Sequence, residues 1–127
     1  MDTSTKGMIT EARVVAALLS KGFCVAKPLV DCRFDLLLVE DGTHKTVQCK
    51  TGRLQDGSVN FNAYSNTPRM GTQDYSDIDY FGVYCFETDA VYLVPTQDVG
   101  TAKPHLRVDP VKNGQKDRVR FAKAYKL

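Results

Sequence analysis

The sequence predicts an α+β (or α/β) domain in which a mixed β-sheet is flanked by helices. Three observations lead to this fold class. Residues 4–22 show helical hydrophobic spacing, residues 23–95 contain several strand-like segments separated by turn signals, and residues 116–125 again have a helical pattern. The length of 127 residues, with no linker, repeat or low-complexity tract, predicts a single domain over residues 1–127.

The first helix is expected over residues 4–22, with Ser4 or Thr5 as its N-terminal cap and Gly22 as its C-terminal stop. Five apolar residues at helical spacing predict its buried face: Met8, Ala12, Val15, Leu18 and Leu19. Glu11 lies on the same face. The sequence therefore places an acid where the helix should pack on the sheet.

Seven segments with a strand-like pattern follow. They are residues 23–30, 34–40, 44–51, 58–64, 80–86, 90–95 and a short segment at 104–109. Pro28 places the first of them near a sheet edge or a bend. The second is a continuous apolar run, which is typical of a strand covered on both faces. The pair Asp41-Gly42 predicts a hairpin between the second and third segments.

The remaining segments are less regular. Residues 65–79 lack periodicity and are rich in turn formers, which predicts a long loop of the kind that is usually functional or mobile. Residues 80–86 and 90–95 should form a second hairpin. Residues 116–125 are expected to form a C-terminal helix with Val119 and Ala122 facing inward.

Composition excludes several classes of protein. The 43% hydrophobic content argues against a disordered chain, and no apolar run approaches the roughly 18 residues of a membrane span. The N-terminus resembles no signal peptide, and the four cysteines lack the spacing of a zinc site, so we expect free thiols in a reducing cytoplasm. Residues 101–127 hold eight basic and two acidic residues, a net +6, within a total of +2. This basic end is compatible with a polyanionic partner.

Four residues form the constellation that carries chemistry. Asp35 opens a buried strand, where a carboxylate needs a partner or a metal. Gln48 and Lys50 project from one face of the returning strand because they are two residues apart. With Glu11 from the helix, they offer two carboxylates and an amide oxygen, which are hard ligands suited to Mg²⁺ or Mn²⁺, and a lysine that can orient a water. The set fits metal-assisted phosphodiester hydrolysis, although each residue alone also fits a structural role.

The pattern Glu11 … Phe34-Asp35 … Gln48-Cys49-Lys50 resembles the PD-(D/E)XK nuclease superfamily, in the variant with Gln at the second acidic position. The segments 5–7, 21–23, 79–84, 91–95 and 113–115 look like those of its group I intron-associated homing endonucleases. The resemblance covers nearly the whole chain. It implies a restriction-endonuclease-like core.

The resemblance also implies roles. Asp35 would be the central metal ligand, Glu11 an accessory ligand, Gln48 the residue at the second acidic position, and Lys50 the catalytic lysine, with the backbone carbonyl of Cys49 as a further ligand. A neutral Gln48 should bind the metal more weakly than an acid. This leaves a catalytically silent DNA-binding module open as an alternative. A structure-selective nuclease is another, because Holliday-junction resolvases have a similar acidic helix and catalytic hairpin at nearly this length.

DNA is the expected partner, and its contacts are assigned from charge and donor chemistry. Candidates for phosphate contact are Arg53, Lys116, Arg118 and Arg120, and candidates for base-edge readout are Asn66, Arg69 and Gln73. A 14.1 kDa chain carries one site, so cutting both strands favours a homodimer or homotetramer. The aromatic segment 80–86 is a second argument for self-association, since it has more apolar surface than a single domain needs to bury at the edge of its sheet. No membrane contact is expected.

Overall fold

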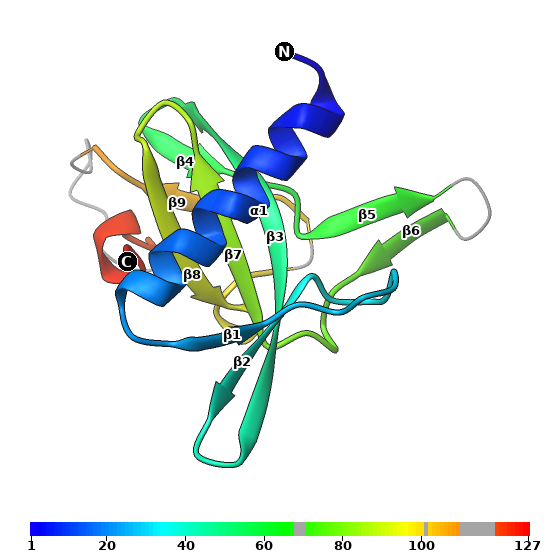
Figure 1. The fold of residues 1–127 in the computed structure, drawn as a ribbon. Helices are drawn as coiled ribbons and strands as arrows, with labels where there is room; N and C mark the ends of the chain where they lie inside the picture. The colour runs from blue at the N-terminus through cyan, green and yellow to red at the C-terminus, as the bar shows by residue number, and fades with distance from the viewer. Residues whose placement is uncertain (68–70, 101, 110–118) are drawn as a thin grey trace.

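The computed structural model describes residues 1–67, 71–100, 102–109 and 119–127, and helix α1 (Thr3–Ser20) lies across one face of a twisted sheet (Figure 1). The helix begins after Asp2 rather than at Ser4 or Thr5, because the Asp2 carboxylate accepts a hydrogen bond of 2.7 Å from the Thr5 N–H. Gly22 follows the last turn in the left-handed conformation, as its position predicts.

The buried face of α1 differs from the predicted one. Its buried residues are Thr10, Val14 and Leu18, whereas Met8 is 72% and Leu19 55% exposed. Thr10 is buried although it is polar, because its hydroxyl lies 2.6 Å from that of Thr51 on the sheet. A search for apolar residues alone therefore selects a face rotated away from the sheet.

The sheet is mixed, as predicted. It contains β1 (Cys24–Ala26), β2 (Leu36–Glu40), β3 (Thr43–Gln55), β4 (Ser58–Asn60), β7 (Tyr80–Cys85), β8 (Ala90–Pro95) and β9 (His105–Arg107). The long strand β3 is shared by three neighbours: it pairs antiparallel with β2 and β4, and parallel with β7. β1 lies at one edge, as Pro28 indicates.

β7 does not support the aromatic argument for self-association. It lies between β3 and β8, and five of its six residues are buried within this chain.

β2 differs in part from the prediction of a strand covered on both faces. Leu36 and Leu38 are buried against α1, whereas Leu37 and Val39 are only half-buried. One face of this strand is covered more completely than the other.

Two apolar clusters fill the opposite faces of the sheet. The first lies between α1 and the sheet and includes Val14, Leu36 and Val47. The second lies on the other face and joins Phe81 and Val83 to Val59 and Leu106 of β4 and β9. β4 and β9 can approach this face because β3 carries Gly52, where a Cβ atom would lie 2.7 Å from Val59 and 2.9 Å from Val83. Gly52 thus marks the place where the end of β3 folds over the second cluster.

The segment predicted as a loop, residues 65–79, begins with a hairpin. β5 (Tyr64–Thr67) pairs antiparallel with β6 (Gly71–Asp74), and this pair, called the arm below, projects away from the sheet (Figure 1). Its sequence is polar, so it carries none of the hydrophobic alternation that identifies a half-buried strand. Backbone pairing, which leaves no sequence signal, defines it.

The predicted C-terminal helix is wrong over residues 119–125, whereas residues 116–118 lie outside the described residues. A short 3₁₀ turn, Ala122–Ala124, is the helical element here. The Leu93 N–H donates to the Tyr125 carbonyl and the Leu127 N–H donates to the Val91 carbonyl, each at 2.9 Å. The terminus therefore satisfies the free edge of β8, which outweighs the local helical pattern. None of the helices that the structure describes has the length and apolarity needed to cross a membrane.

Candidate active site

Asp35 lies just before β2, where it is tied to β3 by two hydrogen bonds. Its N–H donates to the Val47 carbonyl at 2.9 Å, and its Oδ2 accepts the Cys49 N–H at 2.8 Å. Burial is the main effect on this carboxyl and raises its pKa; the Glu11 charge acts in the same direction, while the Cys49 N–H and Lys50 lower it. Asp35 is thus a partly buried acid whose second oxygen, Oδ1, makes no hydrogen bond to the described residues.

Glu11 reaches this region from α1. Its carboxylate forms an ion pair with Lys27, which follows β1, and this pairing raises the pKa of Lys27. Lys27 was missed by sequence reasoning. The partner of Glu11 depends on the position of β1 beneath the helix, and no local sequence pattern predicts that position.

Gln48 and Lys50 share one face of β3, as their spacing predicts. The opposite face carries Val47 and Cys49, which pack in the cluster under α1. Glu11 therefore comes from the helix side of the sheet and Lys50 from the other side, and both charges act on Asp35 at the strand end. The structure brings Glu11, Asp35 and Lys50 into one electrostatic neighbourhood.

The Lys50 ammonium is held without a carboxylate partner among the described residues. Its Nζ donates to the Tyr64 carbonyl at 3.1 Å and lies 4.6 Å from the centroid of the Tyr75 ring. Neither contact neutralises the charge. The lysine is consequently both restrained and able to interact with an anion.

The donor set fits a hard divalent cation. Burial raises the pKa of the neighbouring Cys49 thiol, and the charges of Asp35 and Glu11 act in the same direction. No three His, Cys, Asp or Glu side chains cluster as a metal site in the described ranges, since only two carboxylates are present here. The Gln48 amide, the Cys49 carbonyl and waters would have to complete the coordination, which is the pattern that Mg²⁺ tolerates.

The predicted DNA-contact residues are dispersed. Arg53 is exposed near the end of β3, and Gln73 lies on β6 of the arm. Asn66 occupies β5, where its backbone pairs with Thr72. Arg120 is exposed beside β9. The three remaining candidates lie outside the described residues: Arg69, Lys116 and Arg118.

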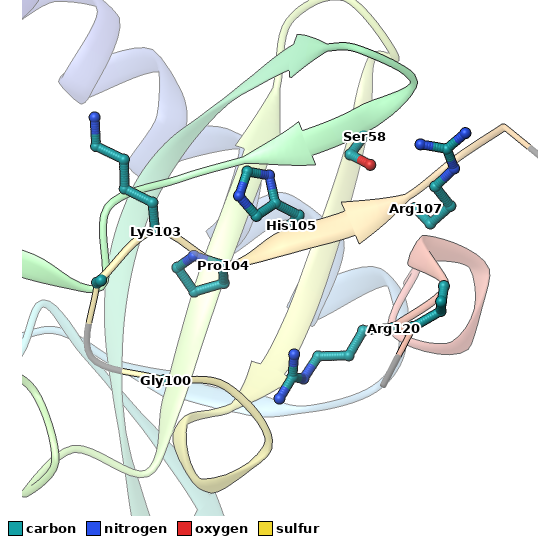
Figure 2. Close-up of a pocket in the computed structure, with 9 residues that line it drawn as sticks. Ser58, Gly100, Lys103, Pro104, His105, Arg107 and Arg120 are labelled. Carbon is teal, nitrogen blue, oxygen red and sulfur yellow. The ribbon is translucent and has the colours of Figure 1, made fainter. Parts of the chain in front are cut away.

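A basic surface emerges where β3, β4, β9 and the C-terminal segment meet. One hollow of about 410 Å³ is lined by Lys103, His105 and Arg107, which lie on β9 or just before it, and by Arg120 from the C-terminal segment (Figure 2). An adjoining hollow of about 270 Å³ shares Lys103 and His105 and adds Arg53. We call these five residues the basic surface. No acid lines either hollow among the described residues.

Sequence reasoning assigned Arg53 and Arg120 but missed three members of this surface, namely Lys103, His105 and Arg107. The net charge of +6 over residues 101–127 was the available signal, but it did not show which of its basic residues gather on one surface. His105 is oriented by Asn60, whose Oδ1 lies 2.5 Å from its Nδ1.

Comparison with known proteins agrees with this fold. The family model described as PD-(D/E)XK endonuclease matches residues 1–127. Among solved structures, a bacterial homing endonuclease, I-Ssp6803I, is similar with a TM-score of 0.71 and 25% sequence identity, over 98% of this chain and 86% of that chain. No curated protein matches the chain.

Proposed function

The chain belongs to the PD-(D/E)XK endonuclease family, and from this premise we propose that it is a site-specific DNA endonuclease of the homing type that uses Mg²⁺ or Mn²⁺. The observation that carries the proposal is the convergence of Glu11 and Lys50 on the partly buried Asp35. Nucleases of this family use divalent metals, and this neighbourhood supplies hard oxygen ligands beside an ammonium that has no carboxylate partner among the described residues.

Asp35 would hold the metal through Oδ1, assisted by the Gln48 amide and the Cys49 carbonyl. Glu11 would join them after exchanging its ion pair with Lys27 for the metal. When bound there, a divalent metal would supply Lewis acidity at the scissile phosphate and lower the pKa of a water. Lys50 orients the attacking water and stabilises the negative charge that develops on the phosphoryl oxygens.

The first test is nicking of supercoiled plasmid carrying the target, by wild type and by Asp35→Ala, with Mg²⁺, Mn²⁺ or EDTA. We expect cleavage by the wild type only when a divalent metal is present, and none by the variant. A variant that still cleaves would contradict the site assignment. Circular dichroism of both proteins controls for folding.

A resolvase-like nuclease is the closest alternative. The two functions differ in readout, because a homing enzyme needs base-edge contacts over a long site, whereas a resolvase reads mainly shape and phosphates. The projecting arm, which carries Gln73, favours base readout. Binding should therefore be tighter to a linear target duplex than to a four-way junction of the same sequence; the opposite order would favour the alternative.

Gln48 motivates the second alternative, a silent DNA-binding module. Gln48→Glu restores the missing negative charge two residues before Lys50. We expect this variant to reach half-maximal cleavage at about tenfold lower Mg²⁺ concentration, because an added carboxylate increases the charge of the ligand set. If the variant cleaves and the wild type does not in any metal, the silent module is the correct description.

We also propose that the chain acts as a homodimer or homotetramer, because each chain carries one site and a duplex has two strands to cut. Sedimentation with and without target DNA would measure the assembly. A strict monomer that cuts both strands at one position would contradict this proposal.

A further inference from the structure

Both contacts of the Lys50 ammonium come from the base of the arm. Tyr64, whose carbonyl accepts the lysine hydrogen bond, is the first residue of β5. Tyr75, whose ring lies 4.6 Å from Nζ, directly follows the last residue of β6. The lysine thus spans from β3 to the two ends of a hairpin that is remote from it in sequence.

The Tyr75 ring is fixed on the sheet side. It is 7% exposed and packs edge-to-face on Phe81, with centroids 5.9 Å apart and an interplanar angle of 90°. Phe81 lies opposite Gln48 in the parallel register of β3 and β7. The ring therefore stands on a rigid strand beside the one that carries Lys50.

Arg33 fixes the same ring from the other segment of the candidate site. Its guanidinium lies 4.8 Å from the Tyr75 centroid and donates two hydrogen bonds to Asp77, at 3.0 and 2.9 Å. It also donates to the Asp74 carbonyl at the end of β6. Because Arg33 is two residues before Asp35, the segment carrying the acid and the strand carrying the lysine meet at one aromatic ring.

We propose that Tyr75 is a positioning residue for Lys50, which it holds at the base of the arm in the direction that catalysis needs. The inference rests on the proposed function, since it assumes that Lys50 acts on the scissile phosphate. A point charge on a four-carbon stem has many rotamers, and the ring face and the Tyr64 carbonyl select among them. Loss of the ring would keep the positive charge of Lys50 but would allow the ammonium to adopt several positions.

A buried aromatic residue also supports the core, so the experiment needs a matched control. Phe61 provides one, because it is 3% exposed and, like Tyr75, packs edge-to-face on Phe81, with ring centroids 5.3 Å apart. Unlike Tyr75, Phe61 has no contact with Lys50 among the described residues. Tyr75→Leu and Phe61→Leu remove comparable packing from the same cluster. Tyr75→Phe keeps the ring and loses only the hydroxyl.

The experiment measures single-turnover cleavage at saturating DNA, DNA affinity without metal, and thermal stability for these variants. We expect Tyr75→Leu to cleave about 10- to 100-fold more slowly with unchanged affinity, because small misplacements of a catalytic group have effects of this order. Tyr75→Phe and Phe61→Leu should stay within about threefold of the wild type, even though Phe61→Leu is destabilised. Equal losses of rate in the two leucine variants would overturn the proposal.

A spectroscopic measurement separates this inference from the proposed function. The ring current of Tyr75 should shift the Lys50 ε-methylene signal upfield in the wild type, Tyr75→Phe and Phe61→Leu, and the shift should vanish in Tyr75→Leu. A signal that does not respond to Tyr75→Leu would overturn the positioning role. Failure of the wild type to cleave any DNA would instead overturn the function on which the inference rests.

Discussion

The candidate active site and the basic surface are both charged, but they are built differently. At the site, a few partly buried groups act on one another: burial raises the pKa of Asp35, Glu11 raises it further, and the Cys49 N–H and Lys50 lower it. The basic surface instead gathers mostly exposed basic side chains from β3, residues 103–107 and the C-terminal segment around two hollows. The difference predicts that substitutions at the site change rate through geometry, whereas substitutions on the basic surface change affinity through charge number.

The largest expected effect is that of Lys50→Met, which keeps the length of the side chain and removes its charge. Cleavage should fall by about 10²- to 10⁴-fold, the range for a lost catalytic or electrostatic group, because Lys27, the other cation that acts on Asp35, lies with Glu11 on the helix side of the sheet. DNA affinity should change by less than about threefold. Single-turnover rates and fluorescence anisotropy measure the two quantities. A large loss of affinity would contradict the expectation that substitutions at the site change rate and not DNA binding.

Gly52 lies on β3 between Lys50 and Arg53 and therefore joins the two regions. Gly52→Ala should reduce the free energy of unfolding by about 1–3 kcal/mol, because its Cβ would lie 2.7 Å from Val59 and force the packed cluster apart. Gly7→Ala is the matched control, since an added Cβ meets nothing within 4 Å on α1 and should stabilise by about 0.5–1 kcal/mol. Urea denaturation that ranks the two variants in the opposite order would contradict the packing argument.

On the basic surface, Lys103→Gln should weaken DNA binding severalfold and reduce the slope of log affinity against log salt by about 0.9. Its single-turnover cleavage rate at saturating DNA should remain that of the wild type. Lys21→Gln removes the same charge after α1, away from both hollows, and serves as the control. Identical salt slopes for the two variants would show that the basic surface does not contact DNA.

The smallest effect concerns the metal-free stability of Asp35→Asn. Because the folded pKa of Asp35 is raised, the charged form costs stability, and the wild type loses stability as the pH rises through that pKa. The amide keeps an acceptor for the Cys49 N–H. At pH 7 the variant should be more stable by less than about 1 kcal/mol, a value reduced by partial solvent exposure, and the difference should shrink towards pH 4. If the wild type is more stable than the variant at pH 7 without metal, this prediction is wrong.

Much of the candidate site follows from sequence alone. The spacing of Gln48 and Lys50 places both on one face because side chains alternate along a strand, and the Asp41-Gly42 turn brings Asp35 beside them. The hairpin of β7 and β8 was likewise predicted from the two strand-like segments that it joins. These features depend on interactions within a few residues.

Other features had no local signal. The Lys27 partner of Glu11, the Tyr75 ring beside Lys50 and the assembly of Arg53 with Lys103 each join residues far apart in the chain. The arm and the paired C-terminus were mispredicted because backbone hydrogen bonds, rather than side-chain patterns, define them.

The sequence by itself determined that Asp35, Gln48 and Lys50 meet on the hairpin of β2 and β3, since turn chemistry and strand alternation are local. Only the tertiary structure decided what restrains Lys50 and where the cations gather. The parallel register of β3 and β7 sets the position of Tyr75, and the close approach at Gly52 lets β4 and β9 fold over the second cluster. These arrangements depend on packing between distant segments, which no window of the sequence contains.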